Sequence, residues 1–471
     1  MPLTKVIGFV YLHYMEDKVI PEHTPHYSFG VDSLLNIYKQ DKQLKELSEL
    51  LKENKKQRVL LKGLTASAKA FAVGAVHQAT PNVHWVILND RESAIYFTND
   101  LENILGETDA DFHSKHVLHY PTSYKRPYEL EKTDNSNVLM RTEVLKRLST
   151  RAKETIVVTY PEALCEKVVN KKYLEKSTLR IAKNETVEQD FVYDMLDEYG
   201  FARVDFVAEP GQFALRGGII DVFSYTNDLP YRIEFIGDEI ASLRSFDPVT
   251  QLSVDNLTHL TIVPNVQDRA LIESRESIME FIPSNTVLWI QDMMLHADRI
   301  NTEFEKAVET FQQLETTVTH LAPEELFLQK NDFLKQILNY DIIEFEKSGL
   351  INTSLSFEFS IQPQPSFNKN FDLLLADLEK NSQHHIKNII LADNAKQVER
   401  IYSIIDDLIK NRKQEDENID FVSINLSLHE GFIDKNNRIA CYTDHQLFER
   451  YHKYKLKESF SGKQALTLKE M

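Results

Sequence analysis

The sequence predicts a multidomain α/β protein, and three observations support this expectation. A chain of 471 residues is too long for a single hydrophobic core. Strands and helices alternate over the first third of the chain, a pattern typical of a parallel sheet with helical crossovers. From Glu209 to Pro248, period-2 alternation and tight turns predict an antiparallel β-meander. We therefore expect a parallel-sheet domain, an α+β domain that carries the meander, and a small C-terminal α/β domain.

Composition gives the protein class. Hydrophobic residues make up 42% of the chain and charged residues 27%, which is ordinary for a globular protein. No apolar run approaches the ~18 to 20 residues of a membrane span, and the N-terminus lacks the basic region and cleavage site of a signal peptide. Two cysteines, Cys165 and Cys441, suggest neither a disulfide framework nor a zinc site. We expect a cytoplasmic protein without membrane contacts.

The net charge of −18 bears on possible partners. A protein that binds double-stranded DNA through the phosphates needs a basic surface, because its affinity comes from the release of counterions from the DNA. An acidic chain favours protein partners with basic faces over nucleic acid.

The first domain is expected to begin with a surface helix over Val31–Leu51, followed by the strand–loop–helix unit Arg58–Ala79. The octet GLTASAKA stands where a P-loop has G-x-x-x-x-G-K-[ST], and it retains Gly63 and Lys69. Ala68 replaces the second glycine, which lets backbone N–H groups turn around a phosphate, and Ala70 replaces the hydroxyl that ligates Mg²⁺. The octet alone fits either an alanine-rich helix that never bound phosphate or a degenerate P-loop in a RecA-like domain. Neither interpretation predicts ATP binding.

Aromatic and basic residues follow the third expected strand, Val117–Tyr120. Tyr124, Lys125, Arg126 and Tyr128 have the chemistry to stack on and pair with a nucleic acid. The segment is short, so an ordinary polar surface loop is the preferred interpretation.

The meander contains a recognisable hairpin. Gly217-Gly218 permits a twist or bulge, and Gly237-Asp238 suits a two-residue turn that would place Phe235 opposite Ile240 and Ile233 opposite Ser242.

After the meander the pattern returns to α/β. The strand Asn285–Ile290 precedes Asp292 and Met293, where an ATPase would have an Asp-Glu pair that holds Mg²⁺ and orients water. A helix is expected from His296 to Thr317. Ser354–Pro365 reads as one strand that ends at a domain boundary, and a compact α/β unit follows it. His384-His385 has no ligand partner at metal-binding spacing and is expected in a surface loop.

Two strings resemble known families. RGGIIDVF and PYRIEFIGDEIASLRSFDP, within the meander, resemble the UvrA-binding domain of the repair helicase UvrB and, more closely, the matching domain of the bacterial transcription-repair coupling factor family, Mfd. CYTDHQLFERYHKYK, from Cys441 to Lys455, resembles that family just before its polymerase-binding domain. The resemblance implies that the octet is a relic P-loop, and that the segment after Val117–Tyr120 has lost the DNA-clamping hairpin of UvrB.

The resemblance also implies a partner surface. Arginines that contact UvrA in the UvrB family correspond to Arg203 and Arg216, and a third corresponds to Ala214, a departure that should weaken the contact. Phe213 and Ile220 are expected to add apolar area, although alternation leaves open whether Ile219 or Ile220 faces outward. The alternative for Arg216 is a solvated strand-edge charge or a local ion pair.

The resemblance implies a division and a role. The expected units are 1–168 and 265–365 for the UvrB-like domain, 169–264 for UvrA binding, 366–455 for the small α/β domain and 456–471 for a flexible tail. The role is the N-terminal, non-catalytic part of the coupling factor, which recruits UvrA to stalled transcription and restrains an ATP-driven motor of the same chain. ATP, Mg²⁺, RNA polymerase and DNA belong to domains absent from this sequence, and no catalytic or metal residues are expected here. The alternative is an active UvrB-like ATP-dependent DNA-repair helicase module.

Overall fold

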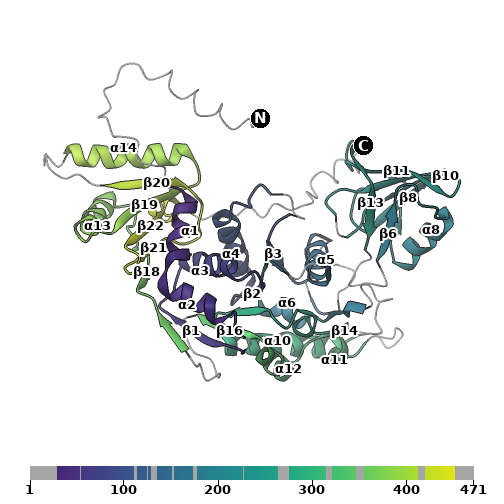
Figure 1. Ribbon diagram of the computed structural model, residues 1–471, viewed down its shortest axis with the longest axis horizontal. Coiled ribbons are helices and arrows are strands. Elements are labelled where there is room, and N and C mark those ends of the chain that lie inside the picture. Colours follow the sequence, from purple (N-terminus) through teal and green to yellow (C-terminus); the bar gives the residue numbers. More distant parts are fainter. Residues whose placement is uncertain are drawn as a thin grey trace, which may run out of the picture.

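The computed structural model describes residues 29–53, 55–110, 114–124, 126–128, 135–150, 153–172, 178–225, 227–263, 275–314, 321–345, 355–411 and 420–450. Lys125 and the expected tail 456–471 lie outside these residues. Figure 1 shows three sheets in a curved row, with the central sheet between the other two. No helix in the described ranges is both long and apolar enough to cross a membrane.

The central sheet has seven parallel strands in the order β17-β1-β16-β15-β2-β4-β3. Its inner strands read as continuous apolar runs because helices cover both faces of a parallel sheet. The strands are β1 (Arg58–Lys62), β2 (Val83–Ile87), β3 (Val117–Tyr120), β4 (Thr155–Thr159), β15 (Val287–Ile290), β16 (Asp341–Phe345) and β17 (Leu355–Glu358). The expected parallel-sheet unit is thereby confirmed, with strands from both sides of the meander.

Helices surround this sheet, and the expected helix over Val31–Leu51 is wrong in one respect. It is two helices, because Asp41 leaves the helical conformation and its carboxylate accepts the backbone N–H groups of Gln43 and Leu44 as an N-cap. The helices of this unit are α1 (Val31–Gln40), α2 (Lys42–Leu50), α3 (Ala68–Ala79), α4 (Arg91–Ile104), α5 (Asn135–Thr150), α6 (Pro161–Cys165), α9 (Ile278–Phe281), α10 (Met293–Gln312), α11 (Pro323–Leu326), α12 (Lys330–Gln336) and η3 (Ile337–Asn339). The short strands β5 (Val168–Val169) and β14 (Arg275–Glu276) pair beside them.

The second sheet holds the meander, in the order β12-β11-β10-β9-β8-β7. One face packs on α8 (Gln189–Glu198) and forms an apolar core with the pair β6 (Leu179–Ala182) and β13 (His259–Ile262). Its strands are β7 (Ala202–Arg203), β8 (Gln212–Arg216), β9 (Ile219–Val222), β10 (Tyr231–Ile236), β11 (Glu239–Phe246) and β12 (Ser253–Leu257).

The hairpin register was predicted in part. Phe235 lies opposite Ile240 as expected, whereas Ile233 lies opposite Leu243 and not Ser242. A bulge between these pairs leaves Ala241 as the extra residue, which shifts the register by one.

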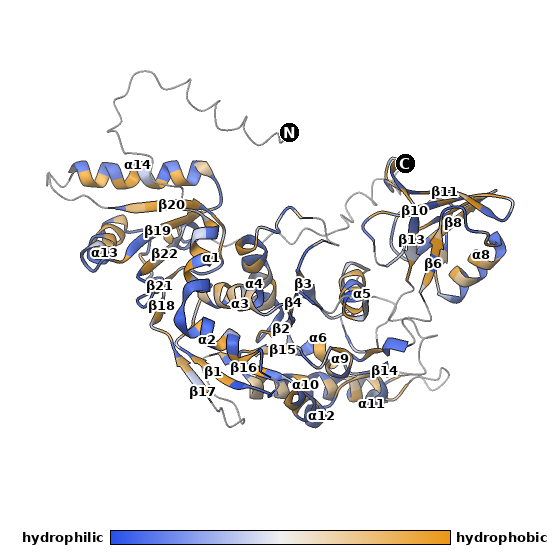
Figure 2. Cartoon of the chain, viewed as in Figure 1, coloured by the Kyte–Doolittle hydropathy of each residue, from blue (hydrophilic) through white to orange (hydrophobic). Residues whose placement is uncertain are grey.

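The third sheet is C-terminal and mixed, in the order β18-β21-β22-β19-β20. The expected single strand 354–365 is two strands, because β17 joins the parallel sheet and β18 joins this one. Figure 2 shows hydrophobic and hydrophilic residues alternating along α14, which buries Ile401 and Ile405 in the core of this unit. The elements are β18 (Ile361–Pro363), β19 (Lys387–Ala392), β20 (Phe421–Asn425), β21 (Phe432–Asp434), β22 (Ile439–Thr443), α13 (Phe371–Gln383), α14 (Ala395–Asn411) and α15 (Asp444–Leu447).

Candidate functional site

Arg216 ends strand β8 and lies on the sheet face opposite α8. Gly217, at φ +60°, begins the tight turn into β9, a backbone conformation that side chains disfavour. Strand pairing sets Arg216 opposite Ile219, so both side chains lie on one face. The Arg216 side chain is 37% exposed, which leaves the guanidinium accessible.

A buried carboxylate orients this guanidinium. Asp221 is fully buried and accepts hydrogen bonds from Arg216 and, through both oxygens, from Arg232, whose Nε and Nη2 lie 2.7 and 2.8 Å from it. The bonds to Asp221 raise the pKa of the Arg232 guanidinium, which also lies over the ring of Phe246 at 4.4 Å. The ion-pair alternative for Arg216 is therefore present in the structure, but the pair leaves Arg216 partly in solvent.

An exposed aromatic residue lies beside Arg216. Phe206 is 62% exposed, and the Arg216 guanidinium lies 5.2 Å from the centroid of its ring. Ile219 adds half-buried apolar surface on the same face. We call Phe206, Arg216 and Ile219 the Arg216 patch. Sequence reasoning missed Phe206, because one aromatic residue in the mostly apolar segment Val204–Ala208 does not signal an exposed side chain.

Two residues expected on the partner surface are in the core instead. Phe213 and Ile220 are fully buried on the face that packs against α8. Their positions in β8 and β9 place them opposite the Arg216 patch, because successive side chains on a strand point to opposite faces. This corrects their assignment to the partner surface, and Ile219 takes the outward position that alternation left open. Ala214, the departure from the family pattern, is also buried.

Arg203 is exposed but lies apart from the Arg216 patch. It pairs in parallel register with Phe213, so it lies on the α8 face, where its guanidinium is 5.9 Å from the ring of Tyr193. The two arginines therefore occupy opposite faces of one sheet, and the structure does not join them into a single cluster.

The expected P-loop position joins β1 to α3. Gly63 has φ +72°, and a Cβ there would lie 2.2 Å from the carbonyl oxygen of Phe359. Ala68 and Ala70 are fully buried in α3, and Lys69 is 8% exposed. Gly63 is thus required in this chain by the close approach of its own backbone, without any phosphate.

Asp292 follows β15 but serves a local purpose. Its carboxylate caps α10 by accepting the backbone N–H of Leu295 at 3.0 Å. Within the described part of the chain, no group of three or more His, Cys, Asp or Glu side chains could hold a metal ion. With Ala70 a buried methyl and Asp292 used as a cap, these residues do not fit Mg²⁺ and ATP in the manner of an active P-loop.

The meander region matches a protein family, and longer stretches of the chain match known proteins. Residues 179–267, which contain β6 to β13, match the family described as UvrB interaction domain. The chain is 29% identical over 254 residues to the transcription-repair-coupling factor of Bacillus subtilis, covering 54% of this chain and 21% of that protein. It is 23% identical to the same factor of Staphylococcus haemolyticus, covering 89% of this chain and 40% of the relative. UvrABC system protein B of Mycoplasma mobile is 26% identical, with 49% and 36% covered.

The chain is therefore similar to transcription-repair-coupling factors, and residues 179–267 match the UvrB interaction domain. It spans less than half the length of these relatives.

In this chain, the aromatic residues considered for nucleic-acid stacking are structural. Tyr124 and Tyr128 are 7% and 8% exposed, and each packs its ring on Phe327. The Tyr128 hydroxyl donates to the carbonyl of Leu321 at 2.8 Å. The two rings therefore pack in the protein core and do not offer a stacking platform, and their burial corrects the preferred interpretation of this segment as an ordinary polar surface loop.

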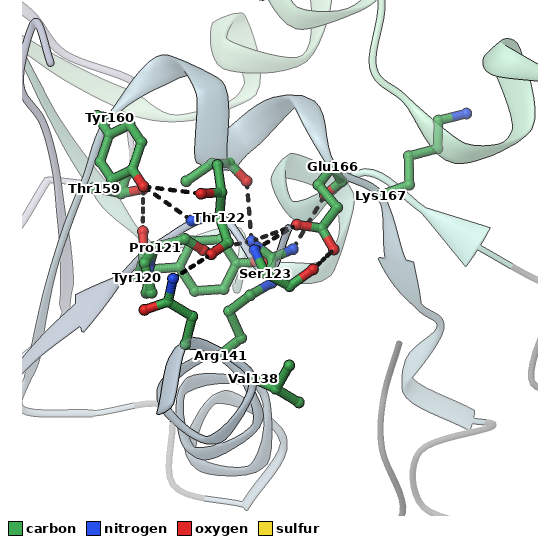
Figure 3. A network of polar contacts seen from close by, with 12 residues as sticks. Tyr120, Pro121, Thr122, Ser123, Val138, Arg141, Thr159, Tyr160, Glu166 and Lys167 are labelled. Atoms are coloured by element: carbon green, nitrogen blue, oxygen red, sulfur yellow. Dashed lines mark hydrogen bonds and ion pairs between the residues drawn. The ribbon is translucent and has the colours of Figure 1, made fainter. Parts of the chain in front are cut away.

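A buried polar network fixes the same segment (Figure 3). Arg141 is fully buried, lies 4.2 Å from the ring centroid of Tyr120, and donates to the carbonyl oxygens of Pro121 and Ala163. Glu166 pairs with Arg141 at 3.4 Å and accepts the backbone N–H and hydroxyl of Ser123. The network ties α5 to the carboxyl ends of β3 and β4, where open α/β sheets otherwise bind ligands.

Proposed function

We propose that this chain recruits UvrA in nucleotide-excision repair and does so without ATP chemistry of its own. The single observation that carries the proposal is the match of residues 179–267 to the UvrB interaction domain. A similarity to UvrABC system protein B also supports a role in excision repair. UvrA is the partner in this proposal. The match to the family supports a UvrA-binding domain but does not identify the contact residues.

We propose that the Arg216 patch is the centre of the UvrA contact. A partly exposed guanidinium, already oriented by a buried carboxylate, loses little conformational entropy when it pairs with a partner carboxylate. An adjacent exposed ring is the other residue type that dominates interface energies. Arg203 lies on the opposite face and forms a second, smaller contact at the edge strand.

The absence of catalysis is part of the same proposal. Ala68 and Ala70 are buried, Asp292 caps a helix, and no group of three or more His, Cys, Asp or Glu side chains among the described residues could hold Mg²⁺, which supports this part of the proposal. We propose that the octet is a degenerate P-loop, that the UvrB-like domain comprises 1–168 and 265–365, and that 366–455 forms the small α/β domain. Motor, DNA and RNA polymerase contacts belong to the longer relatives in this proposal.

Titration calorimetry of the chain with UvrA, in the presence of nucleotide for UvrA, tests this function. The expected result is micromolar or tighter binding that the Arg203→Ala/Arg216→Ala pair weakens by about 2 kcal/mol or more, as for interface arginines. Native affinity in the double variant would support UvrA recruitment but show that the contact lies elsewhere on the chain. No binding would overturn recruitment by this chain and leave restraint of the motor as its role.

A further inference from the structure

A loop of the C-terminal unit lies on the cleft at the carboxyl ends of β1 and β2. The loop is residues 427–431, between β20 and β21, and its backbone bonds to two residues of the parallel-sheet unit. Glu430 N–H donates to Ser67 Oγ at 2.9 Å, and His429 N–H donates to Asp100 Oδ1 at 2.7 Å. Ser67 Oγ donates in turn to Asp100 Oδ2 at 2.5 Å. Ser67 is the residue that directly precedes α3 in the degenerate P-loop.

Ring stacking and buried contacts hold the loop in this place. The rings of His429 and Tyr96 are parallel within 12°, with centroids 3.6 Å apart. Gly431 anchors the loop in its own sheet, since a Cβ there would lie 2.6 Å from the carbonyl oxygen of Cys441. The loop is therefore fixed on both sides, to α4 and to β22.

The contact continues along α3. Tyr38 stacks on Phe71 of α3, both rings meet Phe432 edge to face, and the Tyr38 hydroxyl donates to Asp434 at 3.1 Å. These residues are buried. The loop is thus one end of an extended interface between the C-terminal sheet and the parallel-sheet unit.

The chemistry of the cleft is unsuited to phosphate. About 180 Å³ of space remains in it, lined by Lys69, Asp100 and Glu430 among others. Burial, with a smaller contribution from the nearby charge of Glu430, raises the pKa of Asp100 to about 7, although the hydrogen bonds from Ser67 and His429 lower it. A triphosphate entering here would meet two carboxyl groups and a Ser67 hydroxyl already engaged by the loop.

We propose that the 427–431 loop is an intramolecular plug, which fills the mouth of the degenerate P-loop, excludes nucleotide and fastens the C-terminal unit to the parallel-sheet unit. This proposal does not depend on UvrA binding, because none of the loop contacts described above involves a residue of the meander sheet. It also accounts for Ser67 as part of a packed interface.

Native-state hydrogen exchange of the full chain tests the fastening. Ser67→Ala removes the hydroxyl that accepts Glu430 N–H, and Asp100→Ala removes the carboxyl group that accepts His429 N–H. Each variant is expected to speed exchange at 428–431 by about 10-fold or more, while Ser93→Ala, which alters another serine lining the cleft, leaves it unchanged. Exchange at the native rate in both variants would overturn the plug.

Nucleotide binding tests the exclusion. Ala68→Gly/Ala70→Ser restores the motif, and adding His429→Gly/Glu430→Gly removes the plug side chains. With a fluorescent ATP analogue and Mg²⁺ as the probe, we expect binding at least 10-fold tighter in the four-site variant than in the restored motif alone. Equal binding by the two, or binding by neither, would show that the loop is not what excludes nucleotide.

Discussion

Asp221→Asn should weaken the meander sheet locally by about 2 kcal/mol, and the structure gives the reasoning for this magnitude. Asp221 is fully buried and pairs with Arg216 and Arg232, which are 37% and 16% exposed. Removing one partner of a buried pair costs about 3–5 kcal/mol. Asparagine keeps the shape and one acceptor oxygen, and solvent screens the exposed part of both guanidiniums, so the expected loss is smaller.

Native-state hydrogen exchange of the full chain measures this loss. A decrease of about 2 kcal/mol in the free energy of opening corresponds to roughly 30-fold faster exchange at β9 and β10, with β2 as the unaffected internal reference. Glu234→Gln is the matched control, because the Glu234–Arg244 pair on the same face is 41% and 30% exposed and should contribute less than about 1 kcal/mol. Asp221→Asn exchange within twofold of native would refute the claim that this carboxylate holds the face together.

Three further predictions concern stability. Arg141→Ala should lower the stability of the parallel-sheet unit by about 3–5 kcal/mol, because it leaves Glu166 buried without its partner. Denaturant unfolding followed by tryptophan fluorescence measures this loss, since one tryptophan lies in β2 and the other in β15. A loss below ~1 kcal/mol would contradict the prediction. Asp41→Ala should cost about 1 kcal/mol by removing the α2 N-cap, measured in the same assay, with Asp32→Ala in α1 as the control. Acid should destabilise the chain, because burial lowers the pKa of five histidines to about 3 or 4. These are His77, His84, His119, His296 and His445. The stability present above pH 6.5 is lost as the pH falls from there toward these values, by up to about 1.4 kcal/mol per histidine at pH 5.5. Asp100 acts in the opposite sense: its raised pKa favours the folded state at low pH, and this contribution is lost as the pH rises from about 4 to about 7. Because five histidines oppose one aspartate, we expect the melting temperature to fall between pH 7.5 and 5.5, and an unchanged melting temperature would contradict this prediction.

Local patterns predicted most of the strands and helices, and the errors have physical causes. Buried parallel strands such as β2 and β4 are continuous apolar runs, and they were readable as such. The break at Asp41 was also readable, because aspartate is a preferred N-cap. The bulge at Ala241 was not, since the turn sequence fixes the register only near the turn and the core decides it further away. The split of 355–363 between two sheets depends on long-range pairing that no local pattern contains.

The candidate site was predicted by residue type better than by position. Alternation showed that Ile219 and Ile220 face opposite ways, but only the position of α8 decides which of them is buried. Arg203 and Arg216 are both exposed, yet their strand pairings separate them. The 427–431 loop contacts Ser67, although more than 360 residues separate them in the sequence. Composition, periodicity and motif spacing cannot predict a contact of this kind.

The most direct test of the account compares single arginine variants in calorimetric titration with UvrA. Arg216→Ala should weaken binding by about 2 kcal/mol and Arg203→Ala by less than half of that, since only Arg216 lies in the patch with Phe206. Arg299→Ala is the matched control: Arg299 pairs with Glu162 and is 38% exposed, against 37% for Arg216, but lies in α10. Native affinity in Arg299→Ala together with a loss in Arg216→Ala supports the Arg216 patch as the UvrA surface. Native affinity in Arg216→Ala would contradict it.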